Sequence, residues 1–140
     1  PDSRYRKEAT RLIFVMQDKL IEKEYAAAKL YFDLGTYFGT SSSSSSGNNY
    51  EACVVTAQNA ISDFPYSERR EDFAILIVRA KFELAEQSVE SKKVERFQNA
   101  IDEYHGFVNE YPKSKFLPKA TSLYNRAKAF LAKPQNAAQS

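Results

Sequence analysis

Residues 60–67 have the sequence Ala-Ile-Ser-Asp-Phe-Pro-Tyr-Ser, and residues 107–114 have the similar sequence Phe-Val-Asn-Glu-Tyr-Pro-Lys-Ser. In both stretches an aromatic residue and a proline end one helical pattern, because proline does not continue a helix. A serine follows at the place where the next helix needs an N-cap. A shorter version, Pro-Asp-Ser, occupies residues 1–3. These repeated boundaries predict helices joined by similar corners. The predicted caps are Ser3, Ser67 and Ser114.

Apolar residues recur at steps of three and four along most of the chain, and no stretch alternates as a strand would. The sequence therefore predicts an all-α protein with one domain over residues 1–132 and a tail over residues 133–140. The first helix is either one long helix or two with a bend near Leu20. The predicted helices span residues 3–34, 50–64, 67–89, 93–110 and 114–131.

Two of these helices have distinctive apolar patterns. The third is apolar around much of its circumference, so we expect it in the middle of the stack, buried on more than one side. The first carries a single predicted stripe: Tyr5, Ala9, Leu12, Met16, Leu20, Ala27, Tyr31 and Leu34. The core between the helices is predicted to contain Leu76, Ile77, Ala80, Ile101, Tyr104 and Leu123.

Two segments separate the helical patterns. Six consecutive serines, residues 41–46, cannot offset the entropy of ordering with buried surface, so residues 36–49 are predicted to form a flexible loop. A phosphorylation or glycosylation tract is the functional alternative. The second segment, residues 87–96, is charged, and either a solvated turn or an extension of one helix is compatible with it.

The corners belong to a longer repeat that resembles the tetratricopeptide repeat. Small residues such as Cys53 and Ala100 lie at equivalent positions, where they let two helices approach closely. The equivalent prolines are 47 residues apart, more than the usual repeat of about 34, so we expect longer loops. The resemblance implies helical repeats forming a right-handed α-solenoid. The predicted repeat-packing residues are Ala28, Tyr31, Gly35, Cys53, Ala60, Pro65, Ala100, Tyr104, Phe107 and Pro112.

Beyond the repeat, the chain is similar to the BamD family of outer-membrane assembly lipoproteins. The segment Asp-Lys-Leu-Ile-Glu-Lys-Glu-Tyr, residues 18–25, is the most particular part of this resemblance. The chain departs from the family in its Ser-rich insertion and in lacking a signal peptide, a lipid-modified cysteine and the first repeats. The resemblance thus implies the C-terminal part of such a protein. Its other matching parts are residues 1–5, 28–31, 60–67, 85–88 and 111–115, together with Tyr104 and Phe107.

This resemblance implies a scaffold at the periplasmic face of the outer membrane, within the machinery that assembles and inserts β-barrel proteins. The implied partners are periplasmic domains of the β-barrel subunit and unfolded segments of outer-membrane proteins. Membrane attachment is expected only through an N-terminal lipid anchor outside this sequence, and Cys53 is the wrong cysteine for it. An alternative from a different class is a free tetratricopeptide module, of the co-chaperone or cell-envelope coordinator type, which grips a short peptide tail.

Composition and motifs argue against an enzyme. The 140 residues include one histidine and one cysteine, too few for an ordinary zinc site. His105 has no recognisable nucleophile beside it, and Cys53 is expected to be a small core residue. The net charge of +2, from 20 basic and 18 acidic residues, does not indicate a nucleic-acid partner. We therefore expect a non-catalytic protein that uses no metal and no cofactor.

Two basic pairs are the candidate contacts with a partner protein. Arg69 and Arg70 lie near the start of the third predicted helix, and Lys92 and Lys93 lie where the fourth begins. The arginines are favoured, because a planar guanidinium binds a carboxylate through two parallel hydrogen bonds. A solvated surface is the alternative for all four. Three carboxylates beside the arginines complement the helix dipole: Glu68, Glu71 and Asp72.

Overall fold

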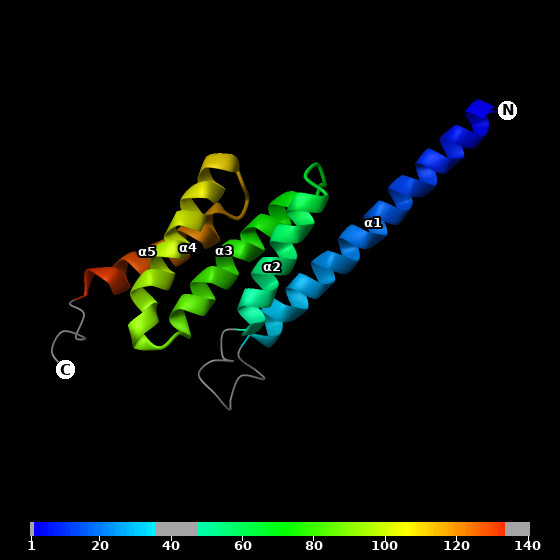
Figure 1. Ribbon diagram of the computed structural model, residues 1–140. Helices are drawn as coiled ribbons and strands as arrows, with labels where there is room; N and C mark the ends of the chain where they lie inside the picture. Colours follow the sequence, from blue (N-terminus) through cyan, green and yellow to red (C-terminus); the bar gives the residue numbers. More distant parts are fainter. Residues whose placement is uncertain (1, 36–47, 134–140) are drawn as a thin grey trace.

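The computed structural model describes residues 2–35 and 48–133, and within them every regular element is an α-helix. Neighbouring helices run antiparallel, and α3 lies in the middle (Figure 1). The all-helical prediction is therefore confirmed for the described residues. Pro1, the serine run over residues 41–46 and the tail from residue 134 lie outside them. The helices are α1 (Asp2–Leu34), α2 (Asn48–Asp63), α3 (Arg70–Glu86), α4 (Glu90–Glu110) and α5 (Leu117–Ala132).

α3 organises the packing, because it contacts all four other helices. Its side chains divide between two groups of buried residues, which we call the N-terminal and C-terminal clusters. The prediction that this helix is buried on more than one side is confirmed. To the N-terminal cluster, shared with α1 and α2, it contributes Phe73, Leu76, Ile77 and Ala80. To the C-terminal cluster, shared with α4 and α5, it contributes Ile75, Val78, Phe82 and Ala85.

The predicted core residues occur in both clusters. Leu76, Ile77 and Ala80 are buried on one side of α3, and Leu123 is buried on the other. Ile101 and Tyr104 are only half-buried at the edge of the C-terminal cluster. The small residues expected to allow close approach of helices do so: Cys53, Ala60 and Ala100 are buried.

The corners α2–α3 (residues 64–69) and α4–α5 (residues 111–116) have the same hydrogen bonds. In the first, the amide of Arg69 donates to Ser67 Oγ at 2.9 Å, and the amide of Arg70 donates to the Ser67 carbonyl at 3.1 Å. In the second, the amide of Phe116 donates to Ser114 Oγ at 3.0 Å, and the amide of Leu117 to the Ser114 carbonyl at 3.3 Å. The sequence repeat is thus also a repeat of backbone geometry.

Several predicted boundaries are wrong by a few residues. Ser67 and Ser114 do bind an amide two residues later, but in a turn that precedes the helix, so α3 and α5 begin three residues after the serines. Ser3 lies inside the first turn of α1 and is exposed, so it is not the cap of that helix. Segment 87–96 is mostly an extension of α4, which begins at Glu90. Residues 48 and 49, predicted as loop, belong to α2.

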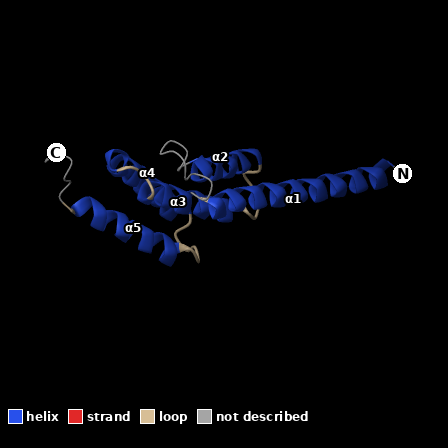
Figure 2. Cartoon of the chain, turned by 90° about the horizontal axis from the view of Figure 1, so that it is seen from below, coloured by secondary structure: helices blue, strands red, loops and turns tan. Residues whose placement is uncertain are grey.

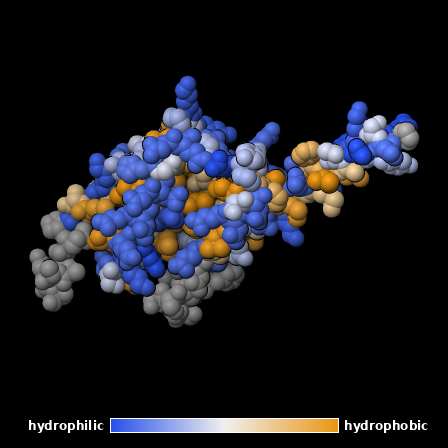
Figure 3. Space-filling model, turned by 45° about the horizontal axis from the view of Figure 1, so that its top comes forward, coloured by the Kyte–Doolittle hydropathy of each residue, from blue (hydrophilic) through white to orange (hydrophobic). Residues whose placement is uncertain are grey.

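α1 is a single helix of 33 residues without a break at Leu20. Only its second half packs on the body, and residues 2–20 are exposed throughout. In Figure 2 this first half continues beyond the other helices, while α5 lies to one side of α3 and α4. Apolar atoms remain uncovered along the projecting part (Figure 3). α1 therefore has more apolar surface than the body covers.

The end of α1 approaches α2 closely at Gly35. This residue has a positive φ of 47°, and its amide donates to the Tyr31 carbonyl at 3.0 Å. A Cβ placed there would lie 2.5 Å from Tyr50 Oη, so this close approach of α1 and α2, at a residue predicted to pack between repeats, requires glycine. The matching prediction for Tyr31 is wrong: it is 37% exposed, and Phe32 makes the edge-to-face contact with Tyr50 instead. One residue along a helix turns the side chain by about 100°.

Candidate functional site

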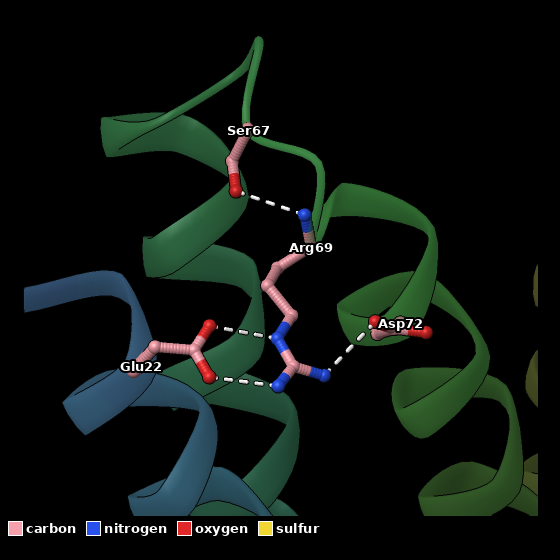
Figure 4. Close-up of polar contacts among 4 residues, drawn as sticks. All are labelled: Glu22, Ser67, Arg69 and Asp72. Atoms are coloured by element: carbon pink, nitrogen blue, oxygen red, sulfur yellow. Dashed lines mark hydrogen bonds and ion pairs between the residues drawn. The ribbon is translucent and has the colours of Figure 1, made fainter. Parts of the chain in front are cut away.

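The α2–α3 corner places Arg69 next to α1. The Ser67 hydroxyl accepts a hydrogen bond from the Arg69 amide, and this bond fixes the backbone of the corner. The arginine side chain then extends toward α1 (Figure 4). The guanidinium then meets Glu22, which is 47 residues earlier in the chain. A corner determined by local sequence thus positions a contact between distant segments.

Arg69 and Glu22 form a bidentate ion pair. Arg69 Nε donates to Glu22 Oε2 at 2.8 Å and Nη2 to Glu22 Oε1 at 2.7 Å, while Nη1 donates to Asp72 Oδ2 at 3.1 Å. The guanidinium also lies 4.3 Å from the centre of the Tyr25 ring. Tyr25 in turn contacts Phe73 edge to face, so the ion pair is linked to the N-terminal cluster. We call Glu22, Tyr25, Arg69 and Asp72 the Arg69 cluster.

The opposite charges of this cluster each stabilise the ionised form of the other. Hydrogen bonds from Arg69 hold the pKa of the Glu22 carboxyl below its ordinary value of 4.5, and partial burial opposes the change. The same bonds raise the pKa of Arg69, so this side chain stays protonated. The pair is therefore ionised at neutral pH. Because both side chains remain partly exposed, at 36% and 54%, the pair fixes geometry more than it adds stability.

A groove of about 800 Å³ lies beside the Arg69 cluster, between α1 and the α2–α3 corner, and we call it the α1 groove. Five carboxylates and one guanidinium line it, which gives a formal charge of −4. Asp18, Asp63 and Glu68 form no ion pair with another described residue. The acidic residues are Asp18, Glu22, Asp63, Glu68 and Asp72, and the apolar ones are Phe14, Ile21, Phe64, Pro65 and Tyr66.

This lining has the chemistry of a binding surface for a protein segment. An apolar floor supplies most of the affinity in such contacts, and charged residues at the rim set orientation and the rate of encounter. Tyr66 is 97% exposed at the corner, and Phe14 is 62% exposed on α1. The groove therefore offers apolar side chains that the chain itself does not cover, next to unneutralised carboxylates.

The four basic residues predicted as partner contacts are not brought together. Arg69 is not free, because its donors are directed to Glu22 and Asp72, and Arg70 Nη2 pairs with Glu110 at 2.6 Å. Lys93 pairs with Glu90 at 3.2 Å, and Lys92 is exposed. The lysines follow α3 while the arginines open it, so the helix separates the two pairs by about 25 Å.

The sequence analysis did not predict that the carboxylates of the α1 groove lie together. Glu68 and Asp72 were assigned to the helix dipole, and Asp18 and Glu22 lie on a helix far away in sequence. One signal pointed to them: residues 18–25, the most particular segment of the resemblance, contain Asp18, Glu22 and Tyr25. The distinctive residues of that segment thus lie at the groove and in the Arg69 cluster.

The remaining chemical candidates have structural surroundings. Burial raises the pKa of the Cys53 thiol to about 12, so it is protonated and a poor nucleophile at neutral pH. His105 is exposed on α4 and contacts the rings of Tyr104 and Tyr124. Within residues 2–35 and 48–133, no three His, Cys, Asp or Glu side chains are arranged to hold a metal ion. None of the described helices is both long and apolar enough to cross a membrane.

Comparisons with known proteins add no family assignment to this geometry. No protein-family model matches the chain, and no curated protein matches it either. The functional conclusion therefore depends on the helices, the α1 groove and the Arg69 cluster.

Proposed function

We propose that this chain is a non-catalytic scaffold that binds partner proteins, within the machinery that assembles and inserts β-barrel proteins in the outer membrane. Its unit is a tetratricopeptide-like pair of helices, and the pairs stack in a right-handed α-solenoid. The proposal is supported by the corners that recur 47 residues apart with the same hydrogen bonds. It is also supported by the similarity of residues 18–25 to the BamD family.

One observation carries the binding role: the α1 groove combines an apolar floor with a formal charge of −4. A complementary partner segment has apolar residues on one side and lysine or arginine beside them. Its apolar side chains would contact Phe14, Ile21 and Phe64. Its basic side chains would approach Asp18, Asp63 and Glu68, the carboxylates without an ion pair among the described residues.

The Arg69 cluster holds this groove in shape. It joins α1 to the α2–α3 corner through Glu22, and these two elements form the opposite walls of the groove. Arg69 is thus a positioning residue on this proposal, and the contacts with the partner are made by the carboxylates and the apolar floor. The proposed partners are periplasmic domains of the β-barrel subunit.

The test is a titration of the full chain with purified periplasmic domains of the β-barrel subunit. The groove variant combines Asp18→Lys and Glu68→Lys, and the matched control combines Glu95→Lys and Asp102→Lys on α4. Both variants change the net charge equally at exposed residues. We expect the groove variant to bind at least about tenfold more weakly, with a loss of salt dependence, and the control to bind like the parent.

Three outcomes are decisive. Equal affinities for parent and groove variant would remove the α1 groove from the interface. No binding by the parent would overturn the proposed partner. If short basic peptides bound in the groove as tightly as the folded domains, the free peptide-binding module would replace the assembly scaffold as the better proposal.

A further inference from the structure

Arg79 lies on the central helix α3, and its guanidinium lies over an aromatic ring of α1. Its Cζ atom is 4.6 Å from the centre of the Phe32 ring. The ring is held in place, because Phe32 packs against the N-terminal cluster and contacts Tyr50 edge to face. Contact with a fixed ring removes part of the water around a guanidinium and restricts its rotamers. The position of the Arg79 donors is therefore largely set before a ligand arrives.

Among the described residues, no carboxylate pairs with this guanidinium. Asp33, the acidic residue next to Phe32, pairs with Lys29 at 2.8 Å. Glu83, one turn after Arg79 on α3, forms no ion pair with any described residue. The positive charge of Arg79 is thus not neutralised by the described part of the chain.

Arg69 shows the same kind of contact with its carboxylates in place. Its guanidinium lies 4.3 Å from the centre of the Tyr25 ring, and Tyr25 is seven residues before Phe32, on the same side of α1. Its nitrogens donate to both oxygens of Glu22 and to Asp72. Both arginines therefore lie over a ring of α1, and one of them binds two carboxylates of the chain.

Arg126 provides a second comparison, because it occupies the position of Arg79 in the next repeat. It follows Arg79 by 47 residues, the spacing of the corner prolines and serines. α1, α3 and α5 run in the same direction (Figure 1), and each of these two arginines reaches the last turn of the preceding helix of this set. Arg126 Nη2 lies 2.6 and 2.7 Å from the two carboxylate oxygens of Glu86. This repeat position thus binds a carboxylate in one repeat, and in the other the last turn of α1 offers Phe32 instead.

Arg79 lies on the same side of α3 as the α1 groove. Asp72, which lines the groove, precedes Arg79 by seven residues, or almost two full turns. The separation along the helix axis is about 10 Å. A segment that lies in the groove and continues along the seam between α1 and α3 therefore passes from a formal charge of −4 to an unneutralised positive charge.

We propose that Arg79 binds an acidic side chain of the partner segment that occupies the α1 groove. The inference rests on the proposed function for its partner, and it adds a requirement on the sequence of that segment. The acidic residue lies about 10 Å from the basic residues, which corresponds to about three residues in an extended segment or about seven in a helix. The planar fork of Arg79 suits a carboxylate held by two parallel hydrogen bonds. A segment with basic residues alone meets a like charge at Arg79 and binds less well.

The first test titrates the full chain with purified periplasmic domains of the β-barrel subunit. Arg79→Gln removes both the charge and the fork, and we expect about tenfold weaker binding. Arg79→Lys keeps the charge without the fork, so most of this loss should remain. The matched control is Arg126→Gln, which removes the same charge at the equivalent repeat position, where Glu86 already occupies the guanidinium. The control should bind like the parent, and circular dichroism checks that each variant folds.

The second test separates the Arg79 site from the identity of the partner. Synthetic peptides carry leucines and lysines for the α1 groove and, after the last lysine, either glutamate or glutamine. One peptide pair places this residue three positions after the lysine, for an extended segment, and the other places it seven positions after, for a helix. We expect the parent to bind the glutamate peptide of one pair about tenfold more tightly than its glutamine counterpart. Arg79→Gln should bind both members of that pair equally.

The outcomes distinguish the Arg79 site from the proposed function. A glutamate preference that Arg79→Gln abolishes would support the site even if the purified domains did not bind, and only the proposed partner would then be wrong. If the groove variant with Asp18→Lys and Glu68→Lys bound the domains weakly while Arg79→Gln bound them like the parent, the Arg79 site would be overturned and the proposed function would stand. Equal affinities within both peptide pairs, or a preference that persists in Arg79→Gln, would also overturn the site.

Discussion

α1 and α3 are the two extremes of this molecule. α3 has 17 residues and buries eight of them, whereas α1 has 33 residues and buries only Ile21 and Ala28. Both helices carry apolar residues on two sides, and α3 is covered on both. The difference shows that the number of apolar residues in a helix sets only how much apolar surface it could bury. Only its neighbours decide how much it does bury.

The largest expected difference between the two helices is in amide hydrogen exchange. An isolated helix of this length is marginally stable in water, so residues 5–20 of α1 should exchange through local opening, while α3 should exchange only when the whole fold opens. We expect protection in α3 to exceed that in residues 5–20 by at least about 100-fold at low protein concentration. Exchange followed by mass spectrometry measures this. Equal protection in dilute solution would contradict the comparison.

The same substitution in the two helices should lower stability by very different amounts. Leu76→Ala leaves a cavity in the N-terminal cluster, where this side chain is 2% exposed, and should lower the free energy of unfolding by about 2 to 5 kcal/mol. Leu30→Ala on α1 removes a side chain that is 57% exposed and should cost less than about 0.5 kcal/mol. Urea unfolding followed by circular dichroism provides both values. Similar losses would show that Leu30 is packed or that Leu76 is not.

Gly35→Ala tests the junction where α1 is held against α2. Alanine is strained at a φ of 47°, and its Cβ would overlap Tyr50 Oη, so we expect a loss of about 1 to 2 kcal/mol. The control is Gly106→Ala on α4, where no atom lies within 4 Å of an added Cβ. That variant should be as stable as the parent or more stable, because alanine favours a helix interior. The contrary result would be a stable Gly35→Ala variant.

The smallest expected effect concerns Glu22, the attachment of α1 to the α2–α3 corner. Its pKa is lower in the folded state than its ordinary value of 4.5. The pair with Arg69 therefore adds its full contribution above that pH, and the contribution disappears as the pH falls through the folded pKa. We expect the difference in unfolding free energy between the parent and Glu22→Gln to be constant near neutral pH and to shrink in acid. Glu24→Gln, on the same helix, should show a smaller difference. A difference in unfolding free energy that widens in acid would mean that the ion pair between Glu22 and Arg69 is not its cause.

Local patterns predicted most of the fold. The third helix was predicted to be central because Ile75 and Val78 interrupt any polar face, and the structure places them in the C-terminal cluster. The corners were predicted from Pro65, Pro112 and the serines two residues later, and their geometry repeats as expected. The helices after the two corners begin about three residues later than predicted. The sequence shows where a turn begins but not how many residues it occupies before the helix.

The site was harder to predict, because it depends on contacts between distant segments. Periodicity identifies neighbours within a helix, but no local rule connects Glu22 with Arg69, 47 residues away. α1 presented a second difficulty, since the residues that pack on the body, Ile21, Tyr25, Ala28 and Phe32, have the same helical spacing as the predicted stripe. The longer stripe with Tyr31 was chosen, whereas the shorter one with Phe32 packs on the body. Which of two equivalent patterns is covered is a property of the whole fold.

The central position of α3 has a consequence for how the molecule melts. In an extended array of repeats, each unit contacts only its neighbours, and the ends can unravel while the middle persists. Here one 17-residue helix forms part of both hydrophobic clusters, with Leu76 and Val78 two residues apart on opposite sides. Loss of α3 removes a wall from both clusters at once, so neither can remain ordered alone. Heating should therefore unfold the body in a single cooperative step, with one calorimetric peak.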